Sequence, residues 1–172
     1  GLRGRSLQDE DEDGPVISDP FRFYLADPRS EGFPSSAIPR LGVAFYFAPD
    51  LLLISERGNQ NLDWYTESIP DKPDTFYIKI DNYSPRRQDH YLRLPNNGNP
   101  DITRFVDEGI DRAIEWNFIS IQTECTETFA LCTVEGNCIS ISGVRDFGGF
   151  GDAANIRSTR DIRNAAQWSR SR

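Results

Sequence analysis

The sequence predicts an α+β protein, made mainly of antiparallel β-sheet in a sandwich or barrel-like arrangement, with one packed helix. Three observations predict this class. Short apolar or alternating runs separated by turn signals follow one another from residue 21 to residue 142. Residues 101–114 instead carry apolar side chains at helical spacing. A length of 172 residues with 37% hydrophobic residues fits one domain with an ordinary core.

Most of the expected elements are short strands. Each is a run rich in apolar, aromatic or β-branched side chains, and Pro, Gly, Asn or Asp residues bound it. In the clearest case Phe76, Ile78 and Ile80 alternate with other residues and share one face. The predicted strands are residues 21–25, 41–47, 51–54, 61–66, 75–80, 91–94, 116–121, 129–134 and 138–142.

Two segments are expected to be helical. Asp101 occupies the N-cap position of the first, and apolar residues recur at helical spacing from Ile102 to Ile114. A short C-terminal helix is expected over residues 159–168, with Ser158 or Thr159 as its cap.

The charge distribution predicts three regions. Residues 1–20 carry two arginines against six acidic residues and almost no large apolar side chains, which predicts a disordered acidic arm or pro-segment. Residues 21–144 are expected to form the folded domain. Residues 145–172 carry six arginines against three aspartates, and are expected to form a basic, Gly- and Arg-rich tail.

The ends and composition of the chain predict a secreted protein. The chain starts at Gly1 and contains no methionine, which predicts that a signal peptide has been removed. Only two of its nineteen basic residues are lysines, and this bias leaves open entry into the cytosol of another organism. A net charge of −8 excludes nucleic-acid binding driven by net charge, and no apolar run is long enough to span a bilayer.

Three cysteines, Cys125, Cys132 and Cys138, lie in the expected C-terminal meander. Their spacing is wider than that of zinc ribbons and fingers, and the single histidine, His90, is far upstream, so no metal site is expected. A secreted chain is expected to hold one disulfide and one leftover thiol. Cys125 with Cys138 is slightly preferred, because a short bridge between Cys132 and Cys138 across a turn tends to be strained, and both pairings stay open.

Turn-rich polar loops are the expected binding regions, because loops change without disturbing a core. Asn82-Tyr83-Ser84 is a glycosylation sequon in one of them. The chain contains neither a phosphate-binding loop with its lysine nor a Gly-x-Ser-x-Gly elbow, so no catalytic residue and no cofactor are expected. The candidate binding residues are Arg57, Asn59, Arg86, Arg87, Asp89, His90, Asn97 and Asn99.

Two short segments carry a family resemblance. Residues 23–33 hold an aromatic residue, Asp27-x-Arg29 and a later Gly32-Phe33, and they resemble the opening strand of heat-labile-enterotoxin-type ADP-ribosyltransferases. Residues 75–81 resemble a core strand of that family. Leu25 stands where the family has the arginine that holds NAD, and no Ser-Thr-Ser strand or Glu-x-Glu or Gln-x-Glu pair is visible. The resemblance therefore implies an enzyme of this type or its inactive relic.

A broader resemblance is one of type. A processed start, an acidic arm, a β-rich body with many aromatic residues and few cysteines are similar to the small secreted effectors of filamentous fungal pathogens. That resemblance implies a non-catalytic protein that binds a host protein or an immune receptor. Residues 21–144 carry 11 basic against 18 acidic residues, which favours a basic partner surface. A carbohydrate-binding module is the third hypothesis, with Trp64, Tyr65 and Trp116 as stacking faces.

Overall fold

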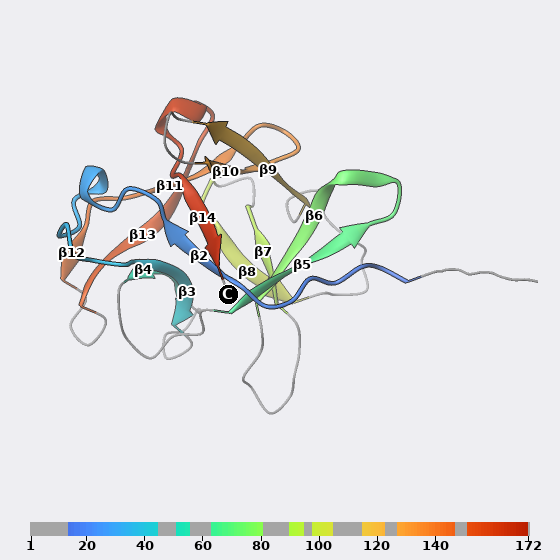
Figure 1. Ribbon diagram of the computed structural model, residues 1–172, viewed down its shortest axis with the longest axis horizontal. Coiled ribbons are helices and arrows are strands. Elements are labelled where there is room, and N and C mark those ends of the chain that lie inside the picture. The colour runs from blue at the N-terminus through green and yellow to red at the C-terminus, as the bar shows by residue number, and fades with distance from the viewer. Residues whose placement is uncertain are drawn as a thin grey trace, which may run out of the picture.

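A computed structural model of the chain describes residues 14–44, 51–55, 63–80, 90–94, 98–104, 115–122, 127–146 and 151–171. This part of the molecule is nearly all β, and no helix in it reaches seven residues. The expected α+β class with a packed helix is therefore wrong, whereas the β-rich character is confirmed. The strands pair antiparallel, and seven of them close into a barrel (Figure 1).

The elements are short, and turns or loops join them. Two single turns of 3-10 helix, η2 (Arg29–Glu31) and η5 (Ile162–Asn164), accompany the strands. The strands are β2 (Arg22–Leu25), β3 (Arg40–Ala44), β4 (Leu51–Ser55), β5 (Trp64–Ile69), β6 (Lys72–Ile80), β7 (His90–Arg93), β8 (Asp101–Arg104), β9 (Glu115–Gln122), β10 (Glu127–Thr133), β11 (Cys138–Ile141), β12 (Arg145–Asp146), β13 (Asp152–Thr159) and β14 (Trp168–Ser171).

The barrel strands follow one another in the order β11-β13-β4-β3-β2-β14-β10, and pairing of β10 with β11 closes the ring. Two strands share one edge of β10, since Phe129 faces Trp168 of β14 and Cys132 faces Cys138 of β11. The other edge of β10 pairs with β9 from Glu127 to Thr133. The sheet then continues through β6 to β7 and β8, with β5 against β6. A second antiparallel sheet is thus attached to the barrel along β10.

Phe23 on β2 lies at the centre of the aromatic core. Its ring centroid is 6.1 to 6.2 Å from the rings of Trp64, Phe118, Phe129 and Trp168. These residues come from the barrel strands β10 and β14 and from β5 and β9 of the attached sheet. The barrel and the attached sheet therefore share one core.

Hydrogen bonds fix the orientation of two buried indoles. Trp64 and Trp116 are fully buried, and their Nε1 groups donate to the backbone oxygens of Leu41 and Leu92, each over 2.8 Å. These hydrogen bonds are favourable, because a buried indole N–H left unpaired costs free energy. Each bond also ties one strand to another that is distant in the sequence.

The expected helix over residues 101–114 does not begin where the sequence places it. Asp101 to Arg104 form β8, and their backbones pair with β7 from Arg93 to His90. Residues 105–114 lie outside the described residues. Local helical spacing was outweighed here by the backbone hydrogen bonds that a neighbouring strand offers.

The expected basic tail is part of the barrel, so the domain boundary at residue 144 is wrong. β13 pairs with β4 and β11, and β14 pairs with β2 and β10. The expected helix over residues 159–168 is reduced to the single turn η5, and the chain then extends into β14. Trp168 is fully buried among barrel residues, and burial of this large side chain accounts for the extended conformation.

The segment at residues 14–20 lies against an edge of the attached sheet. Ser18 N–H donates to Thr66 O and Ser68 N–H to Val16 O, both over 2.9 Å, beside β5 (Figure 1). The hydroxyl groups of Ser18 and Ser68 accept the N–H groups of Thr66 and Val16 in turn. This part of the expected arm therefore covers the edge of β5, and residues 1–13 lie outside the described residues.

We expect Trp168→Ala to destabilise the protein by about 3–5 kcal/mol, because it removes a fully buried aromatic side chain from the barrel. Urea unfolding measures the change. Ile162→Ala, at an exposed position six residues earlier, is the control and should stay within about 0.5 kcal/mol of wild type. Equal stabilities for both variants would mean that the C-terminal segment is a dispensable tail.

We expect removal of residues 1–13 to leave stability unchanged, and removal of residues 1–20 to lower it by roughly 1–3 kcal/mol. The longer deletion removes the hydrogen bonds to Thr66 and Ser68. It also uncovers the edge of β5, and an unpaired edge promotes association between chains. Urea unfolding and sedimentation of the two truncated proteins test this. Equal stability and equal sedimentation of the two truncated proteins would show that residues 14–20 neither stabilise the fold nor shield the edge of β5.

Candidate functional site

A polar cavity lies at one end of the barrel, where β2 ends and β14 begins. Its volume is about 400 Å³. The buried side chains of Leu25 and Ala165 form its apolar part. Its polar lining comes from η2 and the preceding turn on one side and from η5 and the following segment on the other: Asp27, Ser30, Glu31, Arg163, Asn164 and Gln167.

The η2 side of the cavity carries two carboxylates. Asp27 starts a turn in which its Oδ1 accepts the N–H of Ser30 over 3.4 Å and its backbone oxygen accepts the Ser30 hydroxyl over 2.9 Å. Gly32 ends η2 with φ of 103°, a left-handed conformation that favours glycine. Partial burial raises the pKa of Glu31, and the nearby negative charge of Asp27 raises it further.

The η5 side carries a guanidinium whose charge is already matched. Asp161 caps η5 by accepting the backbone N–H of Arg163 over 3.0 Å, and its carboxylate also accepts Arg163 Nε and Nη2 over 3.0 and 2.8 Å. These hydrogen bonds lower the pKa of Asp161 and raise that of Arg163. Within the described ranges, no cation is paired with Asp27 or Glu31, so the cavity keeps an excess of negative charge.

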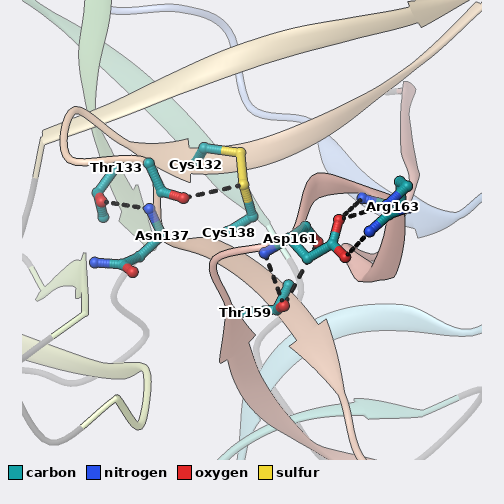
Figure 2. The surroundings of a disulfide bond; sticks show 8 residues. Cys132, Thr133, Asn137, Cys138, Thr159, Asp161 and Arg163 are labelled. Atoms are coloured by element: carbon teal, nitrogen blue, oxygen red, sulfur yellow. Dashed lines mark hydrogen bonds and ion pairs between the residues drawn. A yellow bond between two sulfur atoms is a disulfide. The ribbon is translucent and has the colours of Figure 1, made fainter.

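A disulfide joins Cys132 of β10 to Cys138 of β11, close to η5 (Figure 2). The slightly preferred pairing of Cys125 with Cys138 is therefore wrong, and the alternative is confirmed. The two cysteines face each other in register at the ends of a tight turn, where Gly136 has φ of 88°. That geometry needs the antiparallel register of β10 and β11, which sequence spacing alone does not reveal. Cys125 lies outside the described residues.

A buried ion pair lies on the attached sheet. Lys79 Nζ is 2.9 Å from Glu67 Oε1, and their side chains are only 6% and 15% exposed. Tyr65 and Tyr91 flank Lys79 in register, and their ring centroids lie 5.2 and 5.3 Å from its Nζ. Two aromatic faces and one carboxylate thus surround the ammonium, which indicates a structural role for this lysine.

The structure describes two of the candidate binding residues chosen from the sequence, His90 and Asn99. His90 belongs to β7, where it pairs with Ile80 and Arg104, and Asn99 is exposed in the loop before β8. The others lie outside the described residues, as does the sequon residue: Arg57, Asn59, Arg86, Arg87, Asp89, Asn97 and Asn82.

The cavity residues were missed as a site because they come from the two ends of the chain. The local signals were present, since Asp27 and Ser30 have the spacing of a turn and Asp161 and Arg163 that of a capped turn. Nothing local, however, indicates that the two turns face one cavity.

The described part of the chain contains no group of three His, Cys, Asp or Glu residues that could hold a metal ion. A search of the same residues for a helix with the length and hydropathy of a membrane span found none.

Comparison with known proteins shows the fold alone. No protein-family model and no curated protein matches the chain. A solved Caenorhabditis elegans protein, described as a protein with unknown function, is similar with a TM-score of 0.55 at 15% sequence identity. The similarity covers 94% of this chain and 97% of that one. The overall fold therefore occurs in a second protein whose description names no activity.

We expect Glu67→Gln to destabilise the fold by about 3 kcal/mol, because it replaces the carboxylate that is paired with the buried ammonium of Lys79 by a neutral amide. The tyrosine faces keep the expected loss at the low end of the range for broken buried pairs. Urea unfolding measures it, with Glu135→Gln in an exposed turn as the control, expected within about 0.5 kcal/mol of wild type. A Glu67→Gln variant as stable as the control would contradict the structural role of the pair.

Proposed function

We propose that this protein is a secreted, effector-like, non-catalytic binding protein that engages a basic region of a host protein, and that the cavity takes an Arg or Lys side chain of that partner. One observation carries the proposal: Asp27 and Glu31 line one cavity without a matching cation among the described residues. The host protein is a target or an immune receptor, as the resemblance to fungal effectors implies.

The cavity has the size and charge for a basic side chain. A volume of about 400 Å³ lies in the range of ligand pockets, and Leu25 and Ala165 offer apolar contact to an aliphatic stem. A guanidinium or ammonium between the two carboxylates would lower their mutual repulsion. The net charge of −8 also favours encounter with a basic surface and gives association a dependence on salt.

The disulfide supports the proposed location. Disulfides form and persist in oxidising compartments and are rare in the cytosol, so the Cys132–Cys138 bond is consistent with an extracellular protein.

The two competing functions have less support. A buried leucine occupies position 25, where the ADP-ribosyltransferase resemblance requires a guanidinium to hold NAD. The carbohydrate-binding hypothesis relied on stacking faces of Trp64 and Trp116, and both side chains are fully buried. Tyr65 packs against Lys79.

We expect a short Gly/Ser peptide with one arginine to bind the cavity, and its citrulline counterpart, which has the same shape without the charge, to bind at least tenfold more weakly. Amide shifts of Ser30, Glu31 and Asn164 in an NMR titration locate and quantify binding. Glu31→Gln should weaken binding about tenfold, since a hydrogen bond to a charged group contributes roughly 1.5–3 kcal/mol. Glu127→Gln, an exposed carboxylate elsewhere on the barrel, is the matched control and should bind as wild type does.

We expect the affinity for the arginine peptide to decrease at low pH. Arginine stays protonated throughout, whereas Glu31 binds it only when ionised. Because its pKa is raised, affinity should fall as pH decreases through a value above the ordinary glutamate pKa, and the Glu31→Gln variant should lose this step. Equal binding of the arginine and citrulline peptides would refute the proposed use of the cavity.

A further inference from the structure

The η5 wall of the cavity is built directly on the disulfide. Ala165, which lines the cavity, is buried in one apolar cluster with Ala130, Cys132 and Cys138. The sulfur bridge is thus part of the packing behind that wall. Removal of a bridge from such a cluster changes the contacts of Ala165, because packed interiors transmit small displacements.

Both ends of the η5 loop are also attached to the strand that carries Cys138. Thr159, before the loop, faces Cys138 in the pairing of β13 with β11. Ala166, after the loop, donates its N–H to Ile139 O over 2.9 Å. The loop between them is therefore held at both ends by two consecutive residues of β11.

A chain of hydrogen bonds continues from Thr159 to the cavity. Thr159 Oγ1 accepts the N–H of Asp161 over 3.1 Å, and the carboxylate of Asp161 holds Arg163, which lines the cavity (Figure 2). Figure 2 shows these residues beside the disulfide. The position of Arg163 thus depends on the position of β11.

The pairing of β10 with β11 is short, like the pairings of β10 with β14 and of β2 with β3. Cys132 and Cys138 are its only facing pair among the described residues, whereas β10 pairs with β9 at seven positions. Turn hydrogen bonds from Thr133 N–H to Asn137 O and from Gly136 N–H to Thr133 O are the other backbone links there. The covalent bond therefore holds β11 at a place where few backbone hydrogen bonds do so.

We infer that the redox state of Cys132 and Cys138 controls the cavity, so that the proposed binding of a basic side chain requires the disulfide. This inference rests on the proposed function for its ligand. Reduction by a dithiol breaks the S–S bond, and each sulfur gains one electron and one proton. The reductant loses the same two electrons and two protons and forms its own disulfide. The covalent link between β10 and β11 is then lost, and η5 and Arg163 shift as β11 repacks.

A requirement for the disulfide favours the extracellular space over the host cytosol as the place of binding. Outside the cell the disulfide persists and the cavity keeps its shape, whereas cytosolic thiols reduce such bonds. A protein that entered a host cytosol would therefore lose affinity at this cavity. The binding activity belongs to the extracellular space.

The test compares the full chain in its oxidised form and after treatment with dithiothreitol. Reduction should shift the backbone amides of Asn164, Ala165 and Gln167 and leave those of β5 and β6 in place. Affinity for the arginine peptide should fall at least fivefold, the lower end of typical coupling between sites. Far-UV circular dichroism in both states verifies that the barrel remains folded.

Two cysteine variants assign the effect. Cys132→Ala/Cys138→Ala should resemble the reduced wild type and no longer respond to dithiothreitol. Cys125→Ala should respond as wild type does, because it retains the bridge. Unchanged η5 amides after reduction, or equal peptide affinity in the two states, would overturn the inference. Failure of the oxidised protein to bind the peptide would sink the proposed function, while the amide shifts still decide the coupling between disulfide and cavity wall.

Discussion

Two strands, β14 and β11, pair with the same edge of β10, and this arrangement organises both the barrel and the attached sheet. A closed barrel has no free sheet edge, so its last strand must return to its first. Here β10 pairs with β14 at Phe129 and with β11 at Cys132, and its other edge remains for β9. One strand thus closes the barrel and carries the attached sheet. The shared core around Phe23 follows from this arrangement.

The pairing of β14 with β2 creates the cavity. Because β14 pairs with β2, the turn after β2 and the loop before β14 meet at one end of the barrel. Asp27 and Glu31 then share a cavity with Arg163, although they lie far from it in the sequence. The disulfide lies between the two strands that close the barrel and packs against Ala165 in the cavity wall. The β10–β11 pairing, the disulfide and the cavity wall are therefore in direct contact with one another.

The charged side chains of this protein fall into two groups: those paired with an opposite charge and those without such a partner among the described residues. Lys79 with Glu67 and Arg163 with Asp161 are matched pairs, and each holds backbone elements in position. Asp27 and Glu31 are unmatched among the described residues, and partial burial, with the negative charge of Asp27, raises the pKa of Glu31. Matched pairs suit structural roles, because an isolated buried charge is costly. Carboxylates without a paired cation in a concave site are suited to binding a cation. The cavity is therefore a better candidate for binding than the two ion pairs.

The amino-acid pattern alone was enough to predict the local features of the chain. Alternation at Phe76, Ile78 and Ile80 places strand β6, and Gly136 marks the turn between the two cysteines, because side-chain period and backbone conformation are local properties. Only the tertiary structure decided that Asp101–Arg104 is a strand, that Trp168 lies inside the barrel and that Cys138 pairs with Cys132. It also decided that Asp27 and Arg163 line one cavity. Each of these depends on which strands become neighbours, and hydrogen bonds and burial between distant segments set that choice.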